Sequence, residues 1–186
     1  GGVDVYSIRQ PLGVVAGITP FNFPAMVPMW MFGNAIATGN TFVLKPSTVD
    51  PSVSIYLAQL MKEAGLPDGW CQGILTSSLD VAAQLVTDKR AGFFSFIGSA
   101  RVGWMLRSKL APGTRCALEH GGAAPLILAE DADMELAVPA VAKGGFYHAG
   151  QVCVSVQRVF CHDSIAEDVA QRGVQQVRRR MVERGV

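Results

Sequence analysis

Three side chains in this sequence could do chemistry together. Cys153 stands in an apolar turn between an expected helix and a run of β-branched residues, a placement suited to a nucleophile. Glu119 stands in a glycine-rich turn and offers a carboxylate, and Asn22 stands between two prolines and offers an amide. An isolated free cysteine is more often a buried structural thiol. The carboxylate and the amide are what favour a reactive role for Cys153.

The composition indicates a chain with more apolar surface than a free-standing domain usually has. Of its 186 residues, 49% are hydrophobic and 17% are charged. Such values suggest surfaces that other protein covers, so we expect a fragment of a larger polypeptide. The formal net charge of +1 gives no basis for binding nucleic acid or a membrane. The arginines at residues 178–180 are expected to form a solvated helix face.

The cysteines give no sign of disulfides or of a metal site. Cys71, Cys116, Cys153 and Cys161 include no CxxC pair, and the three histidines have no metal-ligand spacing with them. We therefore expect no metal and a reducing compartment, namely the cytoplasm. No stretch reaches the roughly 20 apolar residues of a membrane span, and residues 1–4 do not resemble a signal peptide.

Apolar runs and helical patterns alternate through the first two thirds of the sequence. The run at residues 12–18 is apolar on both sides, as in a strand inside a parallel sheet. Gly39 supplies a left-handed helix stop, and Asp50 with Pro51 supplies an N-cap and a first helical residue. The expected strands are residues 12–18, 41–44, 70–75, 93–97 and 115–118, and the expected helices are residues 23–38, 51–64, 78–87 and 99–110. This alternation predicts an α/β fold with a doubly wound parallel sheet.

The pattern changes after Gly122. The expected elements are a strand at residues 126–128, a helix capped by Asp133 and running to Phe146, a strand at residues 154–160 and a helix at residues 164–184. This part is too short to bury a core of its own. We place a domain boundary after Gly121. Residues 1–121 are expected to form a Rossmann-like cofactor domain, incomplete at its N-terminus, and residues 122–186 to open an α/β catalytic domain.

Parallel sheets of this kind bind ligands at the carboxyl ends of their strands. The residues that follow the expected strands are 20–22, 45–48, 98–99 and 119–122. No GxGxxG motif occurs. Instead, Gly98 and Ser99 open a helix whose free N–H groups could face a diphosphate. Serine is also a common N-cap in any helix, so this junction is informative only through its place in the series.

Residues 20–24, 118–122 and 150–158, in this order, resemble the motifs of the aldehyde dehydrogenase superfamily. The resemblance covers essentially the whole chain. Residues 6–69 are most similar to methylmalonate-semialdehyde dehydrogenases, and residues 143–160 to the phosphonoacetaldehyde and lactaldehyde groups. The resemblance implies oxidation of a small aldehyde or semialdehyde with NAD or NADP, in a parent that is a homodimer or homotetramer.

The resemblance also implies a role for each of the three side chains. The Cys153 thiolate attacks the aldehyde carbon, and the Asn22 amide and the Cys153 backbone N–H stabilise the alkoxide. Hydride then passes to the nicotinamide and leaves a thioester. Glu119 is the general base that activates water to hydrolyse this thioester. Members that transfer the acyl group to coenzyme A lack this glutamate, so Glu119 favours water over coenzyme A as the acceptor.

Cofactor and substrate positions follow from the same resemblance. The positions that match cofactor contacts are Ile18, Thr19, Pro20, Lys45, Ser47, Thr48, Gly98, Ser99, Val102 and Gly121. Many NAD-specific members have a glutamate at position 48, which repels a 2′-phosphate, so Thr48 should admit NADP. Val27 and Trp30 match the substrate tunnel, although an aromatic residue at helical spacing is more often core.

Two points separate this chain from the usual pattern. His120 stands where the superfamily usually has leucine; it either tunes Glu119 electrostatically or packs beside the cofactor for shape, and shape is the favoured interpretation. The second point is length, because downstream sequence of the family is missing. We expect the 186-residue chain alone to be inactive. The alternative function is a truncated chain that binds a nucleotide or a partner without turning over aldehyde.

Overall fold

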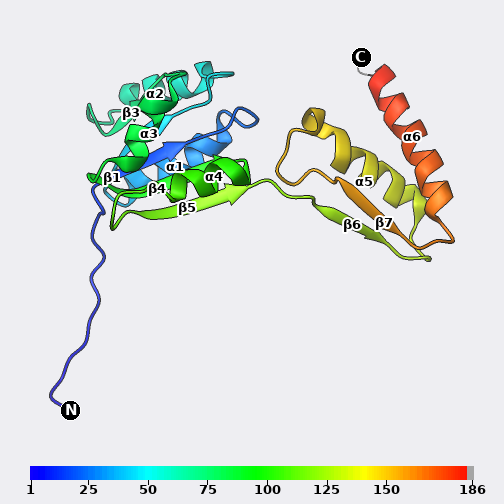
Figure 1. Ribbon diagram of the computed structural model, residues 1–186, viewed down its shortest axis with the longest axis horizontal. Helices are drawn as coiled ribbons and strands as arrows, with labels where there is room; N and C mark the ends of the chain where they lie inside the picture. Colours follow the sequence, from blue (N-terminus) through cyan, green and yellow to red (C-terminus); the bar gives the residue numbers. More distant parts are fainter. Residues whose placement is uncertain (184–186) are drawn as a thin grey trace. The chain divides into compact units, whose positions relative to one another are not determined.

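A computed structural model describes residues 1–183 of the chain. It divides into two compact units, Gly1–His120 and the chain from Gly121 onward, and each is described by itself. Figure 1 labels the elements of both. Among the described residues, no helix is both long and apolar enough to cross a membrane. Within the same residues, no group of three or more His, Cys, Asp or Glu side chains could hold a metal ion.

The first unit is built on a five-stranded parallel sheet with the strand order β3-β2-β1-β4-β5. Its strands are β1 (Val14–Ile18), β2 (Thr41–Lys45), β3 (Cys71–Gly73), β4 (Ala91–Gly98) and β5 (Arg115–His120). Strand order moves outward from β1 in both directions, which makes the sheet doubly wound. The fold class expected from the alternating pattern is confirmed.

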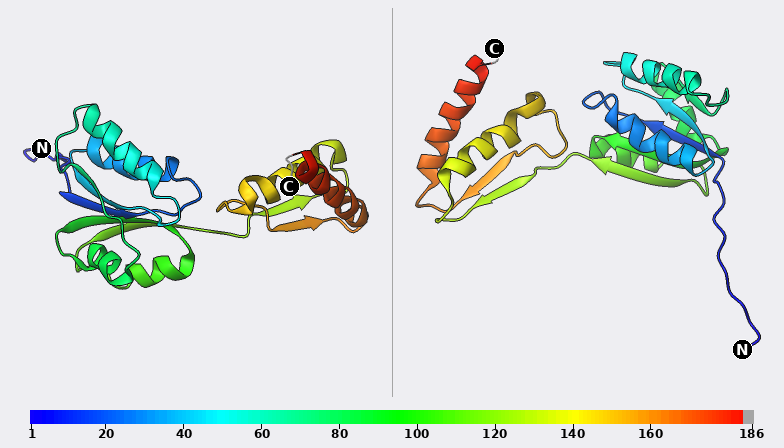
Figure 2. Two further views of the ribbon diagram at one scale, coloured as in Figure 1. Left: turned by 90° about the horizontal axis from the view of Figure 1, so that it is seen from above. Right: turned by 180° about the vertical axis from the view of Figure 1, so that it is seen from behind.

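Helices cover the sheet on both faces. They are α1 (Met26–Ala37), α2 (Ser52–Glu63), α3 (Leu79–Thr87) and α4 (Ala100–Arg107). In the view from above in Figure 2, α1 and α2 lie on one face of the sheet and α3 and α4 on the other. Each face has its own apolar core. One core contains Phe42 and Met31, and the other contains Phe94 and Leu106.

β1 lies at the centre because both of its faces are apolar. Val15 packs in the core beneath α1, and Ala16 packs in the core beneath α4. Gly17 allows the closest approach, since a Cβ atom there would lie 2.5 Å from Cζ of Phe42. The Phe42 ring is fully buried and meets Phe32 edge to face, with 6.5 Å between ring centroids. Central packing of this kind holds the end of β1 in a fixed position.

The second unit pairs two parallel strands and two long helices. Its elements are β6 (Pro125–Leu128), α5 (Met134–Phe146), a 3-10 turn η1 (Tyr147–Gly150), β7 (Arg158–Cys161) and α6 (Ala166–Glu183). The expected cap of α5 is present, because the Asp133 carboxylate accepts from the Glu135 N–H at 2.9 Å. Pro139 lies inside α5 without ending it.

Several expected element ends differ from the structure. Asp50 does not cap α2, because its carboxylate accepts from the Ser52 hydroxyl at 3.0 Å and Pro51 takes the N-cap position. The helix expected from residue 23 begins at Met26, and the strand expected from residue 154 begins only at Arg158. The last residue of the helix expected at 164–184 lies outside the described part of the chain.

Candidate active site

The carboxyl edge of the first sheet gathers most of the positions singled out in the sequence. Ile18 at the end of β1 pairs with Lys45 at the end of β2, and Gly98 at the end of β4 pairs with His120 at the end of β5. All these strands are parallel, so the residues that follow them emerge at one edge. Asn22 lies half-buried in the turn between β1 and α1, at this same edge.

Thr19 contributes a buried hydroxyl at this edge. Its backbone N–H donates to the Lys45 carbonyl oxygen at 3.2 Å, which joins the ends of β1 and β2. The residue is only 4% exposed, and its Oγ1 has no hydrogen-bond partner within residues 1–183. A buried hydroxyl without a partner costs stability unless something else bonds it. A polar group of a bound cofactor would satisfy it.

Lys45 is the last residue of β2, and Ser47 and Thr48 follow the strand. Burial lowers the pKa of the Lys45 ammonium below its ordinary value, because the charged form loses solvation. The Ser47 hydroxyl accepts from the Val49 N–H at 3.2 Å and so shapes the turn. Thr48 is exposed. A partly desolvated cation next to the half-buried Ser47 hydroxyl and the exposed Thr48 hydroxyl suits recognition of an anionic or hydroxylated ligand.

The start of α4 is open toward the same edge. Ser99 occupies the N-cap position, but within the described chain its side chain makes no capping bond to the helix. The first-turn N–H groups of α4 are therefore left to a ligand or to solvent. Position 98 needs glycine for steric reasons, since a Cβ atom there would lie 2.6 Å from Cζ of Phe96. Val102 packs against the core beneath α4. Together with Thr19 and Lys45, these groups fit a dinucleotide with a diphosphate.

Glu119 lies inside β5 rather than after it, because the strand continues to His120. Its side chain is exposed, and it borders a hollow of about 480 Å³ that Trp30 and Met31 of α1 also line. Alternation along the strand sends His120 to the opposite face, toward α4. The Glu119 carboxylate is thus accessible on the α1 face of the sheet.

The two expected substrate-tunnel residues have different surroundings. Val27 is 2% exposed and belongs to the core between α1 and the sheet. Trp30 is 48% exposed on the same helix. Of these two residues, therefore, only Trp30 has a side chain exposed enough to meet a ligand.

Cys153 occupies a hydrogen-bonded turn of the second unit. The Ser155 N–H donates to the Val152 carbonyl oxygen at 3.0 Å, which closes a β-turn with Cys153 and Val154 at its centre. Val152 and Ser155 are buried, Cys153 is half-buried and Val154 is 62% exposed. The half-buried Cys153 thiol thus lies in a turn whose first and last residues, Val152 and Ser155, are buried.

Further bonds fix this turn to its surroundings. The Ser155 hydroxyl donates to the Gly150 carbonyl oxygen at 3.0 Å. Beyond the turn, the Val156 N–H donates to the Gly144 carbonyl oxygen at 3.0 Å, and the Gln157 N–H donates to the Ala123 carbonyl oxygen at 3.1 Å. These bonds tie the residues that follow Cys153 to Gly150, to the end of α5 and to the segment before β6.

A left-handed segment leads into the turn. His148, Ala149 and Gly150 have φ values of 54°, 55° and 71°. Such values cost about 1 kcal/mol or more for a residue with a Cβ atom, so neighbouring bonds must hold this segment. The sequence predicts a special conformation only at Gly150. Neither alanine nor histidine signals one, and sequence reasoning therefore missed the segment.

Gly121 belongs to the second unit, as does Cys153, whereas Asn22, Glu119 and the other cofactor positions belong to the first. The structure thus describes the Cys153 turn separately from the sheet edge. Five of the expected site residues share one edge of the first sheet: Asn22, Thr19, Lys45, Ser99 and Glu119. Cys153 lies in the second unit and is described separately.

Comparison with known proteins identifies the family. The model of the aldehyde dehydrogenase family matches residues 1–185. The chain belongs to the aldehyde dehydrogenase family. A methylmalonate-semialdehyde dehydrogenase [acylating] of Arabidopsis thaliana is 43% identical over 159 residues, which are 85% of this chain and 26% of that protein. A 3-sulfolactaldehyde dehydrogenase of Priestia aryabhattai is 41% identical over 160 residues, which are 86% of this chain and 33% of that protein.

Solved structures agree with the sequence comparison. Betaine aldehyde dehydrogenase from Staphylococcus aureus, solved in complex with NAD+, superposes with a TM-score of 0.87 at 37% identity, covering 90% of this chain and 34% of that one. The expected family is thus confirmed. A methylmalonate-semialdehyde dehydrogenase is among the relatives found, as expected. The chain spans about a quarter to a third of the length of the relatives that it matches.

Proposed function

We propose that the protein to which this chain belongs oxidises a small aldehyde or semialdehyde to the carboxylic acid with NAD or NADP. One observation carries the proposal above the others. The Cys153 thiol stands in a turn with the Ser155 N–H bonded to the Val152 carbonyl at 3.0 Å, in a chain that belongs to the aldehyde dehydrogenase family. A half-buried thiol on a fixed turn suits attack on a carbonyl.

In the first step, the Cys153 sulfur forms a bond to the aldehyde carbon, and the carbonyl oxygen becomes an alkoxide. The Cys153 backbone N–H and the Asn22 side-chain amide are the donors that we assign to this oxygen. The Cys153 N–H suits this role because the turn bond engages the Ser155 N–H instead. As the alkoxide collapses to a thioester, the carbon loses a hydride.

NAD or NADP, when bound, supplies the hydride acceptor. The residues that we assign to hold it lie along the carboxyl edge of the first sheet. Thr19 offers its buried hydroxyl, Lys45 its partly desolvated ammonium, and Ser99 the open first turn of α4. An orphaned hydroxyl and an open helix start at one edge are what a diphosphate and its riboses require.

In the second step, Glu119 removes a proton from water, and the resulting hydroxide attacks the thioester carbon. The acid leaves and the Cys153 sulfur is regenerated. The exposure of the Glu119 carboxylate supports this role, because the base must reach solvent water. One relative named as acylating is 43% identical to this chain over 159 residues, so transfer to coenzyme A is the second candidate. The carboxylate at Glu119 favours water.

A second alternative is a chain that binds a nucleotide or a partner without oxidising aldehyde. Cys153, Glu119 and Asn22 are all present, and this favours the enzyme. We propose a cytoplasmic homodimer or homotetramer for the complete protein, in keeping with its four free cysteines.

Selective alkylation tests the assignment of Cys153. All four cysteines are half-buried, so exposure alone does not single one out. We expect iodoacetamide to inactivate the complete protein in proportion to labelling of the Cys153 peptide, with the other three cysteines labelled without loss of activity. Inactivation that follows Cys71, Cys116 or Cys161 instead would contradict the proposal. Aldehyde-dependent reduction of NAD or NADP by the unlabelled protein is the positive control.

A further inference from the structure

His120 is packed onto the helix that carries the candidate diphosphate site. Its ring lies 5.5 Å from the Trp104 ring of α4 and 6.4 Å from the Phe96 ring of β4, measured between centroids. Its Nε2 atom is buried and has no hydrogen-bond partner within residues 1–183. This nitrogen therefore bonds no neighbour among the described residues, and the ring packs against two aromatic rings.

Gly103 is the residue that admits this ring. A Cβ atom at Gly103 would collide with Nε2 of His120 and would lie 2.9 Å from its Cδ2. Gly103 does not have the left-handed φ that would require glycine. It lies inside α4, where glycine makes a helix less stable than alanine does. Space for His120 accounts for this glycine.

The contact joins two parts of the candidate site. Gly103 belongs to the first turn that Ser99 opens, since its N–H donates to the Ser99 carbonyl oxygen at 2.9 Å. His120 is the residue next to Glu119 at the end of β5. A shift of the His120 ring on α4 would rotate the strand end and move the Glu119 carboxylate on the other face.

We propose that His120 is a positioning residue, which uses its contact with Gly103 to fix the start of α4 relative to Glu119. This inference rests on the proposed function, because it assigns Ser99 to the cofactor and Glu119 to the base. The role depends on the shape of the ring, since its Nε2 bonds no group in the described chain. Leucine, the residue that the superfamily usually has here, should perform it as well.

A double-mutant cycle in the complete protein tests this coupling. Its readouts are the dissociation constant for NAD and the ratio of the first hydride burst to steady turnover. We expect Gly103→Ala to weaken NAD binding about tenfold and to slow turnover more than the burst, because the methyl group displaces His120. His120→Ala should cost about threefold, and the double variant should bind NAD within about threefold of wild type, since the smaller side chain leaves room for the methyl group.

Three controls make the cycle decisive. Gly33→Ala adds a methyl group to α1, where a Cβ atom meets nothing within 4 Å, and should leave both readouts unchanged. His120→Leu should keep NAD affinity and the burst ratio, as a shape role demands. Thermal unfolding of each variant separates loss of fold from loss of position, and the double variant covers the case in which Gly103→Ala alone does not fold.

Two results would overturn the proposal. Additive effects of the two substitutions on NAD affinity would show that the contact does not position α4. The two substitutions could also be coupled in thermal stability while NAD affinity and the burst ratio stay unchanged. That result would show that His120 packs against Gly103 without positioning α4 relative to Glu119. Repeating the NAD measurements in a Cys153→Ser background keeps the inference apart from the proposed function, because binding can be measured there even if aldehyde is never oxidised.

Discussion

The Ser155 hydroxyl donates a hydrogen bond to the Gly150 carbonyl oxygen, 3.0 Å away. Ser155 is 2% exposed, and Gly150 ends a left-handed segment that begins at His148. The bond therefore joins the unusual backbone before Cys153 to the buried anchor after it. A thiol two residues from such an anchor has little freedom to move.

Ser155→Ala should slow aldehyde oxidation about tenfold with little change in fold. The substitution removes a part-buried hydrogen bond to the Gly150 carbonyl oxygen, which costs about 1 kcal/mol, and the turn relaxes away from its reactive geometry. The rate constant for alkylation of Cys153 and the steady-state turnover both measure this effect.

A matched serine provides the control for this substitution. The Ser108 hydroxyl also donates to a backbone carbonyl, that of Met105 at 2.8 Å, but it is exposed and belongs to the first unit. Ser108→Ala should leave both rates unchanged. Equal rates for wild type and Ser155→Ala would mean that the other bonds of the turn suffice to hold Cys153.

Glu119→Gln should leave the first hydride burst intact and slow steady turnover by about a hundredfold or more. The amide keeps the size of the side chain but cannot take a proton from water, so only hydrolysis of the thioester suffers. Rapid-mixing measurement of the burst, followed by turnover, checks both parts. Glu63→Gln, at an exposed position of α2, is the control. Loss of the burst itself would place Glu119 in an earlier step, such as activation of Cys153.

Much of the first unit could be predicted because its signals are local. The apolar run that contains β1 predicts a central strand, and Gly39 predicts the end of α1, where its φ is 81°. The cap expected at Asp50 is wrong, because its carboxylate accepts from the Ser52 hydroxyl and Pro51 is the N-cap residue of α2. Capping depends on which donor the side chain reaches first, and residue types do not fix this.

The Cys153 turn shows what a pattern cannot supply. Residues 154–160 contain three valines and a phenylalanine, a composition typical of a strand. In the structure, Val154 is part of a turn and β7 begins only at Arg158, because the Ser155 N–H bonds back to Val152. Likewise, the packing of His120 on Gly103 joins residues far apart in sequence, and only the fold brings them together.

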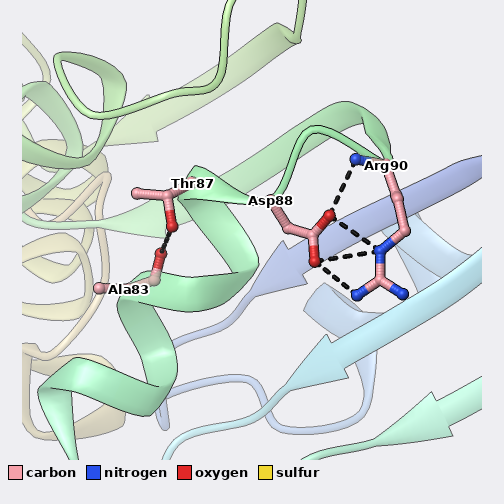
Figure 3. A network of polar contacts seen from close by, with 4 residues as sticks. All are labelled: Ala83, Thr87, Asp88 and Arg90. Carbon is pink, nitrogen blue, oxygen red and sulfur yellow. Dashed lines mark hydrogen bonds and ion pairs between the residues drawn. The ribbon is translucent and has the colours of Figure 1, made fainter.

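The turn before β4 gives a pH-dependent prediction. Figure 3 shows the Arg90 guanidinium bonded to both carboxylate oxygens of Asp88, with Nη2 2.6 Å from Oδ2 and Nε 3.0 Å from Oδ1. These bonds, followed by one from the Arg90 backbone N–H, lower the pKa of Asp88 to about 2. A carboxyl group whose folded pKa is depressed stabilises the fold above its unfolded pKa of roughly 3.9. This contribution is therefore lost as the pH falls from about 4 through 2.

Arg90→Gln should raise the pKa of Asp88 toward its ordinary value without fully restoring it, because the backbone N–H bond at 2.9 Å remains. An NMR titration of the Asp88 carboxyl carbon measures the change. Lys89→Gln is the matched control: Lys89 lowers this pKa only as the last of the causes, so the shift should be small. An unchanged pKa in Arg90→Gln would mean that the backbone bond alone holds the carboxylate in its charged form.

Thr48 makes the last prediction, which concerns the choice of cofactor. We expect the complete protein to bind NADP at least as well as NAD. Thr48 is exposed just after β2 and carries no charge, and Lys45, three residues earlier, adds a cation at the same edge. A carboxylate at position 48 would meet the 2′-phosphate of NADP across a short distance, and the two negative charges would repel each other.

Thr48→Glu should therefore shift the ratio of the two dissociation constants toward NAD by at least about tenfold, mainly by weakening NADP. Thr48→Gln separates charge from size, since it adds the same bulk without the carboxylate and should shift the ratio little. Raising the salt concentration should shrink the effect of Thr48→Glu, because exposed charges are screened. A wild type that strongly prefers NAD, with a ratio that Thr48→Glu leaves unchanged, would show that position 48 does not face the 2′ position of the ribose.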